Sequence, residues 1–309
     1  MDRTLGEEVY VIDGAQSMRP FLVSVVSDSD HWLFVASNGG LTAGRRNPGV
    51  ALFPYVTEDK IVDGAGTTGP VTAVRVTRAG RTSLWHPFRD CDRLAYRITR
   101  RLEKDVVGSR LVFEEENHDL GVVFRYAWTT SARFGFVREC ALENRGPGPI
   151  RVEVLDGLLN LLPANVDEAL QQGYSCLLDA YKRAEVVPGT TLALYALAAQ
   201  PVDRAEPCES LRASTAWSHG LGRPRVHLSA DRLASFDAGR AARPAAEVRG
   251  RRGAYLLEAR FSLDSGASRP WTVVADVDRS QAQVVELLAG LRRPGLLLGE
   301  VEKDVAAGR

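Results

Sequence analysis

The chain has 309 residues with 39 basic and 39 acidic side chains, and this zero net charge argues against a nucleic-acid partner, whose binding needs a basic surplus. With 45% hydrophobic and 25% charged residues, the composition is typical of a globular protein and excludes a disordered one. No apolar run approaches the roughly 20 residues that span a bilayer, and no signal sequence is visible, so we expect a cytoplasmic protein without a membrane partner.

The first two-thirds of the sequence has the pattern of β-strands separated by Gly, Asn, Asp and Pro. The strongest hairpin signal is Ala79-Gly80 between two short β-branched runs. Many evenly spaced strands with few helical periods predict a sandwich or barrel rather than alternating strands and helices. The strands expected here cover residues 21–27, 32–37, 71–77, 81–85, 96–103, 109–116, 121–130, 134–143 and 150–162.

The remaining third mixes helices with further strands. Residues 166–183 and 280–291 carry apolar side chains at helical spacing, and a third amphipathic pattern runs over 297–305. The segment 238–253 is rich in Ala, Arg, Gly and Pro and is expected to be an exposed loop. Further strands are expected at residues 191–199, 225–229, 255–263 and 270–276. We therefore expect a β domain over residues 1–278 and a helical extension or linker over 279–309.

The segment 37–46, SNGGLTAGRR, follows an aromatic strand and contains three glycines. Such a turn bends sharply or lies close to another group, so at least one of Gly39 and Gly40 is expected to have a positive φ. Two interpretations stay open. The turn either connects a hairpin or borders a ligand groove or interface, with Asn38, Gly39 and Gly40 near the ligand and Arg45 as a donor.

A second candidate site is the aromatic and polar cluster at the end of a strand, WHPF followed by Arg89 and Asp90. Sugars stack their C–H faces on aromatic rings and hydrogen-bond through hydroxyl groups. Trp85, His86 and Asp90 have the chemistry for such contacts. The alternative is that Trp85 and Phe88 pack in the core.

Residues 64–69, GAGTTG, match the letters of the dinucleotide-binding motif GxGxxG. That motif holds a pyrophosphate only when it opens a helix. Here Pro70 and a β-branched run follow, so the segment is expected to be a loop before a strand, and we expect no cofactor.

The acidic cluster contains Glu114, Glu115, Glu116 and Asp119, and in principle two carboxylates cleave a glycosidic bond. Adjacent strand residues point to opposite faces, so a solvated strand end and turn is the favoured interpretation. The four cysteines form no CxxC and the five histidines never pair at ligand spacing, so buried free thiols and no metal site are expected. The cysteines are Cys91, Cys140, Cys176 and Cys208.

Several segments together resemble the N-terminal domain of glycoside hydrolase family 94, which includes cellobiose and chitobiose phosphorylases and the phosphorylase-like region of cyclic β-glucan synthases. Residues 32–61 resemble its opening, in which a strand enters an Asn-Gly-Gly turn followed by Ser or Thr and another strand. The WHPF segment at 85–88 takes the place of the family's Trp-Ser segment but lacks the Ser. Residues 116–121, 136–144 and 150–162 are similar to later family strands.

The resemblance implies a mainly β fold, a galactose-mutarotase-like super-sandwich of antiparallel sheets with a few short helices. In the family a helical (α/α) barrel with the catalytic aspartate follows this domain, and no segment here matches that aspartate, so no catalytic residue is carried over. The resemblance also implies a carbohydrate partner, a downstream helical domain in the same protein, and a homodimer, because homodimers occur in the family.

Three functions remain open. The first is a non-catalytic carbohydrate-associated N-terminal domain of a phosphorylase- or glycosidase-like protein, whose sugar site a downstream barrel completes. The second is a stand-alone sugar mutarotase or epimerase, which would accelerate interconversion of sugar anomers. The third is a structural interaction domain that binds no sugar at all.

Overall fold

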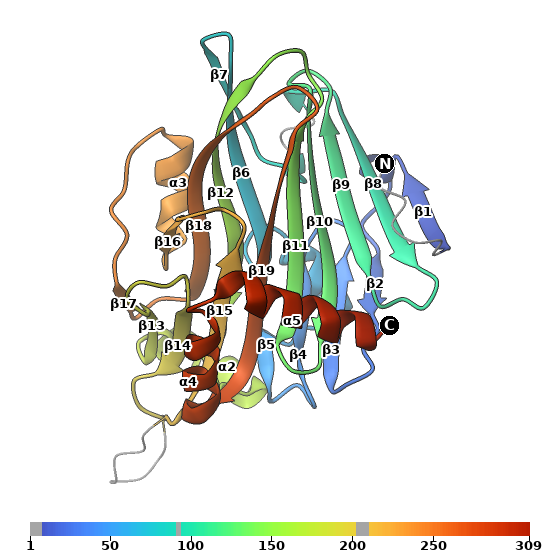
Figure 1. Ribbon diagram of the computed structural model, residues 1–309. Helices are drawn as coiled ribbons and strands as arrows, with labels where there is room; N and C mark the ends of the chain where they lie inside the picture. Colours follow the sequence, from blue (N-terminus) through green and yellow to red (C-terminus); the bar gives the residue numbers. More distant parts are fainter. Residues whose placement is uncertain (1–7, 91–93, 202–209) are drawn as a thin grey trace.

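The computed structural model describes residues 8–90, 94–201 and 210–309, which form three antiparallel sheets and a few short helices (Figure 1). Every sheet neighbour among the described strands is antiparallel, and most helices are short. The expected fold class, mainly β with stacked antiparallel sheets, is confirmed.

The largest sheet has ten strands and combines the early and late parts of the chain. Its last strand along the sequence, β19, lies between β11 and β15 in the middle of the sheet. In spatial order the strands are β1 (Val9–Asp13), β8 (Ile98–Asp105), β9 (Leu111–Asn117), β10 (Val122–Ser131), β11 (Gly135–Asn144), β19 (Ser268–Ser280), β15 (Arg212–His219), β14 (Ala193–Leu197), β13 (Lys182–Val186) and β17 (Glu247–Arg249).

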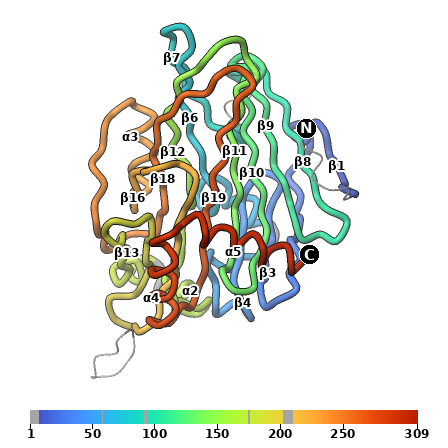
Figure 2. The backbone as a smooth tube through the Cα atoms, in the orientation of Figure 1, coloured from blue at the N-terminus to red at the C-terminus, as the bar shows by residue number. Residues whose placement is uncertain are grey.

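Two smaller sheets complete the sandwich. The five-stranded sheet has the order β16 (Arg225–His227), β18 (Gly253–Leu263), β12 (Ile150–Leu161), β6 (Gly69–Arg78) and β7 (Arg81–Trp85). The four-stranded sheet has the order β2 (Leu22–Val25), β3 (His31–Ala36), β4 (Leu41–Arg45) and β5 (Ala51–Phe53). The predicted hairpin joins β6 to β7, with Ala79 and Gly80 both at positive φ, and forms the upper tip of the tube in Figure 2.

The main core fills the space between the sheets. Alternate side chains point inward, so Phe124, Tyr126 and Trp271 of the large sheet meet Val154 of the five-stranded sheet and Leu33 of the four-stranded sheet in one buried cluster. This period-two burial is the physical basis of the alternation seen in the sequence.

Helices cover the outer faces and one end of the sandwich. Helix α3 (Asp231–Asp237) packs Phe236 on the outer face of the five-stranded sheet. Helices α4 (Gln281–Gly290) and α5 (Pro294–Ala307) lie across the outer face of the large sheet, as Figure 1 shows. The other elements are the one-turn η1 (Ala15–Ser17), α1 (Glu58–Asp63) and α2 (Glu168–Asp179).

The structure corrects several expected boundaries. The expected helix over 166–183 ends at Asp179, because the following residues alternate and pair as β13. The expected loop over 238–253 contains the short strand β17. The expectation of buried thiols holds for Cys140 but is wrong for Cys176, which lies exposed on α2, whereas Cys91 and Cys208 lie outside the described residues.

The amphipathic segment expected at 297–305 is the middle of α5. Its apolar stripe, Leu297, Val301 and Val305, packs against Trp217 and Val274 of the large sheet. The sandwich itself therefore covers this apolar stripe. Within the described residues, no helix combines the length and apolar character that crossing a membrane requires.

Candidate functional site

A pocket of about 380 Å³ opens between the inner face of the large sheet and three loops, and we call it the His86 pocket. The β3–β4 turn, the loop before β6 and the segment after β7 form its walls, together with α3. Its size lies at the lower end of small-molecule sites, which span about 300–1,000 Å³. The polar or charged side chains that line it belong to Asn38, Thr67, Thr72, His86, Arg89, Asp90, Tyr126, Arg138 and Asp237.

The β3–β4 turn is fixed against α1. Asn38 Nδ2 donates to the carbonyl oxygen of Val62 at 2.9 Å, and Gly39 has φ +93°, which confirms the predicted positive φ. A Cβ on Gly40 would lie 2.0 Å from the carbonyl oxygen of Ile61, so only glycine fits there. The turn therefore has one glycine for conformation and one for close approach.

The buried carboxylate of Glu115 fixes the segment after β7 through hydrogen bonds. Glu115 accepts from the indole N–H of Trp85 at 2.9 Å, from the backbone N–H of Phe88 at 2.8 Å and from Arg100 Nε at 2.6 Å. Arg100 also donates to Asp90 at 2.7 Å. These contacts fix Phe88 in its left-handed conformation (φ 66°) and place its flanking side chains at the pocket.

Burial and charge act in opposite directions on Glu115. Burial raises its pKa, the neighbouring charge of Arg100 lowers it, and burial has the larger effect, so the pKa lies above its ordinary value. The sequence analysis placed this residue at a solvated strand end, and that expectation is wrong, because Glu115 is fully buried. Glu114 and Glu116 point to the opposite face and stay partly exposed, as strand alternation requires.

One wall of the His86 pocket carries a histidine–carboxylate pair. His86 Nε2 lies 2.7 Å from Asp237 Oδ1 at the end of α3, and Arg89 lies 3.7 Å from the other oxygen of that carboxylate. A carboxylate in this position orients an imidazole ring for hydrogen bonding or proton transfer. The pair joins two segments 151 residues apart in the sequence.

The floor of the pocket is a fully buried ion pair. Arg138 Nη1 donates to both oxygens of Asp156 at 3.0 and 2.9 Å, while Thr72 and Trp271 each donate to that carboxylate at 2.7 Å. Burial alone would lower the pKa of Arg138, but the charge and hydrogen bond of Asp156, together with Cys140 and Tyr126, outweigh burial and raise the pKa. The guanidinium therefore stays charged and fixed beneath the ring of Tyr126, 4.6 Å from its centroid.

Two donors at this floor lack a protein acceptor. Arg138 Nε is buried and makes no hydrogen bond in the described part of the chain. The Tyr126 hydroxyl, which lies close to Gly39, likewise has no hydrogen-bond partner among residues 8–90, 94–201 and 210–309. Burial raises the pKa of Tyr126, so its hydroxyl remains protonated.

The seven candidate residues from the sequence divide into two groups. Asn38, Gly39, His86 and Asp90, from two separate segments, line the same pocket. The other three do not line it. Gly40 and Trp85 are buried behind its walls, so the Trp85 ring offers no face to a ligand, and Arg45 lies in a different cavity.

Residues 64–68 form the loop between α1 and β6, and Gly69 begins β6, so the expectation of a loop followed by a strand is confirmed. Part of this loop, Ala65 to Thr67, lines the His86 pocket. Within the described residues no three His, Cys, Asp or Glu side chains lie close enough together to hold a metal ion.

Sequence reasoning missed Tyr126, Arg138, Asp156 and Asp237. A signal existed for two of them, because Arg138 and Asp156 fall on the buried phase of otherwise apolar strands. A charged residue at such a position indicates a buried polar network. Asp237 had no comparable signal, because α3 lies where no helical period was recognised.

The sequence matches no protein-family model and no curated protein. Among solved structures, the fold is similar to a putative aldose 1-epimerase from Escherichia coli K12, with TM-score 0.46 and 11% identity over 84% of this chain and 99% of that one. It is also similar to a bacterial glucoamylase complexed with acarbose, with TM-score 0.42 and 10% identity over 96% of this chain and 40% of that one.

A polysaccharide lyase is similar as well, with TM-score 0.43 and 10% identity over 86% of this chain. The chain spans only 33% of the length of that lyase.

Proposed function

We propose that the His86 pocket binds a neutral carbohydrate and that this chain is a carbohydrate-binding domain without catalytic activity of its own. The observation that carries the proposal is the Tyr126 hydroxyl, a donor that lines the pocket and has no hydrogen-bond partner among the described residues. A ligand hydroxyl oxygen that accepts from it would add about 0.5–1.5 kcal/mol to the free energy of binding.

The walls supply the complementary chemistry. Asp90 and Asp237 offer acceptors for sugar hydroxyl groups, and Phe88 with Val71 and Leu233 provides apolar surface for C–H groups. The charged lining consists of two guanidinium groups, Arg89 and Arg138, and these two carboxylates. Because the charges balance, a neutral polyhydroxyl ligand fits better than a uronic acid or a sugar phosphate.

The test is calorimetric titration with neutral monosaccharides and β-linked oligosaccharides. Tyr126→Phe removes only the hydroxyl and should weaken binding about 2- to 13-fold, which corresponds to one hydrogen bond. The matched control is Tyr10→Phe on the exposed edge strand β1, which should bind as the native chain does. Equal affinity of the Tyr126→Phe and native chains, or no binding of any sugar, would contradict the proposal; the latter would favour a structural domain.

A narrower form of the proposal places this chain before a helical catalytic domain, as in glycoside hydrolase family 94. The gene sequence beyond Arg309 tests it directly. Release of sugar phosphate from a β-glucan oligomer by the 309-residue chain alone would contradict it.

One observation favours a second function, sugar mutarotation. His86 held by Asp237 at 2.7 Å is suited to take a proton from an anomeric hydroxyl group, and Tyr126 is a protonated donor in the same pocket. Polarimetry of freshly dissolved α-glucose and α-galactose separates the two functions. We expect a mutarotation rate no higher than that of the buffer control. An acceleration that His86→Gln abolishes would show that the pocket catalyses mutarotation and does not only bind sugar.

A further inference from the structure

A second, larger cavity of about 730 Å³ lies at the opposite end of β4, between the large sheet and helices α4 and α5. We call it the arginine cavity. Unlike the His86 pocket, it is dominated by guanidinium groups from five separate parts of the chain. They belong to Arg45, Arg46, Arg133, Arg212, Arg279 and Arg293.

The backbone of β19 is irregular where it borders this cavity. Val277 and Asp278 together face the single residue Ser214 of β15, because the register shifts between Ala213 and Thr215. Asp278 has φ 63°, which is rare for a residue other than glycine. In a regular strand successive side chains alternate between faces, whereas here all four residues 276–279 line one cavity.

A second irregularity lies opposite, at the end of β4. Arg46 has φ 60°, and both Arg45 and Arg46 line the cavity although they are adjacent in the chain. The Arg46 guanidinium is paired with the Asp278 carboxylate across the cavity. Left-handed non-glycine residues are energetically unfavourable by about 1–3 kcal/mol and gather at functional sites.

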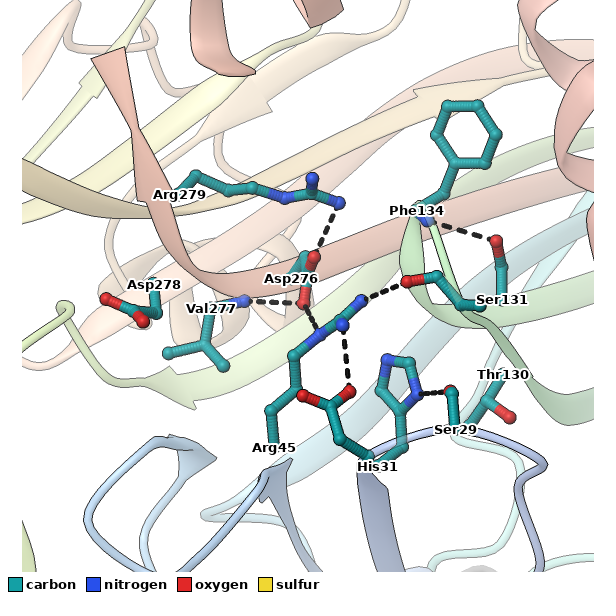
Figure 3. A network of polar contacts seen from close by, with 12 residues as sticks. Ser29, His31, Arg45, Thr130, Ser131, Phe134, Asp276, Val277, Asp278 and Arg279 are labelled. Atoms are coloured by element: carbon teal, nitrogen blue, oxygen red, sulfur yellow. Dashed lines mark hydrogen bonds and ion pairs between the residues drawn. The ribbon is translucent and has the colours of Figure 1, made fainter. Parts of the chain in front are cut away.

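Part of this cavity is a network of ion pairs and hydrogen bonds around Arg45 and Asp276, which Figure 3 shows. Arg45 donates to Asp276 at 2.8 Å, to Asp30 at 2.9 Å and to the carbonyl oxygen of Ala132 at 2.8 Å. Arg279 contacts the other oxygen of the Asp276 carboxylate at 2.5 Å. The Asp276 carboxylate is therefore shared by two arginines.

The remaining positive charge is incompletely compensated. Arg133 forms ion pairs with Glu286 of α4 and Glu300 of α5, at 2.8 and 2.9 Å. The other five arginines then face only three carboxylates, those of residues 30, 276 and 278. Among the described residues, no carboxylate lies within ion-pair distance of Arg293.

Donor groups are also left over. Arg279 Nε is buried and has no hydrogen-bond partner in the described part of the chain. Burial and the nearby charge of Arg45 lower the pKa of Arg279, and the Asp276 carboxylate offsets this only in part. An added negative charge beside Arg279 and Arg212 would offset the excess positive charge.

We propose that the arginine cavity is a second ligand site, which binds a doubly charged oxyanion such as a phosphate or sulfate group between Arg279, Arg212 and Arg46. Arg46 and Arg212 share the Asp278 carboxylate. Across the whole cavity, Arg293 included and Arg133 with its two glutamates set aside, arginines outnumber carboxylates by two, which favours a dianion. Guanidinium groups bind tetrahedral oxyanions through paired hydrogen bonds. The site lies apart from the His86 pocket, so the inference does not depend on sugar binding.

Calorimetric titration of the whole chain with sodium sulfate and sodium phosphate, at constant ionic strength maintained with chloride, tests the proposal. We expect one-to-one binding that is at least tenfold weaker in Arg279→Gln and in Arg212→Gln. The matched control is Arg260→Gln, an exposed arginine on β18 whose ion-pair partner is Glu153, and it should bind as the native chain does.

The proposal would be overturned if no one-to-one binding with a dissociation constant below about 10 mM is found. Equal affinity of the three variants would also overturn it, because surface ion pairing alone would not discriminate among these arginines. If Arg279→Gln fails to fold, Arg212→Gln decides, because the Arg212 side chain is 48% exposed and its loss leaves the core intact. Methyl phosphate distinguishes the source: tighter binding than inorganic phosphate would assign the anion to an organic ligand, and the reverse order to the free ion.

Discussion

Gly39 and Gly40 are neighbours for which glycine is required on different grounds. Gly39 adopts φ +93° and has an open side, since the nearest contact of an added Cβ is the Tyr126 hydroxyl at 3.5 Å. Gly40 has no positive φ, but its added Cβ would lie 2.0 Å from the backbone oxygen of Ile61. The first is a conformational requirement and the second is a steric one.

We predict that Gly40→Ala is the more damaging of the two substitutions. Gly39→Ala should lower the free energy of unfolding by about 1 kcal/mol, the usual effect at a left-handed position. Gly40→Ala should lower it by about 3 kcal/mol, because the backbone of α1 has to move. Urea unfolding measures both values, and equal losses would contradict the steric explanation.

His31 is a second residue whose environment has a measurable consequence. Its ring stands edge-on to Phe136, and its Nε2 is buried without a hydrogen-bond partner among the described residues. Burial and the charge of Arg45 lower its pKa from 6.5 to about 3. In the unfolded chain, His31 therefore binds a proton below about pH 6.5, whereas in the folded chain it binds one only below about pH 3.

Because the unfolded state holds more protons in this range, stability should fall as the pH drops from 6.5 towards 3. Between pH 7 and pH 5 we predict a loss of about 2 kcal/mol that is absent in His31→Phe. Urea unfolding at both pH values measures it. The exposed-histidine control, His118→Gln, should keep the native pH dependence, and a native-like loss in His31→Phe would disprove the assignment.

At the scale of elements, the sequence predicted the long strands well and the short ones poorly. Strands β6, β7 and β9 to β12 are rich in β-branched and aromatic residues and are bounded by turn-forming residues, so their positions were predicted within a few residues. Strand β4, LTAGR, is short and contains glycine, and β15 begins with small polar residues, so neither has a local signal. Their strand conformation comes from pairing with neighbours, which no local pattern encodes.

The candidate site was predictable in part for the same reason. The turn at Asn38 and the segment from His86 to Asp90 have distinctive local composition, and both line the pocket. Arg138 and Asp237 contribute through long-range contacts, with partners 18 and 151 residues away in the sequence. Only the three-dimensional structure shows these partners.

Helix α5 provides a test of what holds an outer element in place. Leu297 is 5% exposed and packs on the sheet, whereas the adjacent Leu296 is 66% exposed. We predict that Leu297→Ala lowers the free energy of unfolding by about 2–5 kcal/mol and reduces amide protection in α5. Leu296→Ala, the matched control, should have little effect.

Arg133 also connects α4 and α5 to the β10–β11 turn, but it is half exposed. Arg133→Ala should therefore lower the free energy of unfolding by about 1 kcal/mol or less, which is the usual contribution of an exposed ion pair. A larger loss in Arg133→Ala than in Leu297→Ala, measured by hydrogen exchange, would show that charge and not burial docks the helix.

At the scale of the whole molecule, the large sheet is assembled from distant parts of the chain. Strands β8 to β11 form one half and β13 to β15 most of the other, and β19 joins them by pairing with both β11 and β15. Each half alone would present a long unpaired edge, a feature that promotes association with other chains. The sandwich therefore cannot be divided at the middle of the sequence.

The central place of β19 has a consequence for biosynthesis. Translation delivers the chain from its N-terminus, at about 5–20 residues per second, so both halves of the large sheet leave the ribosome before the strand that joins them. We predict that chains truncated after residue 264 and released from the ribosome stay sensitive to protease, and that released chains of 309 residues resist it. Limited proteolysis of the two released chains would measure this, and a resistant core in the chain truncated after residue 264 would contradict it. Until β19 emerges, the edges of β11 and β15 lack a partner strand and are open to association with other chains.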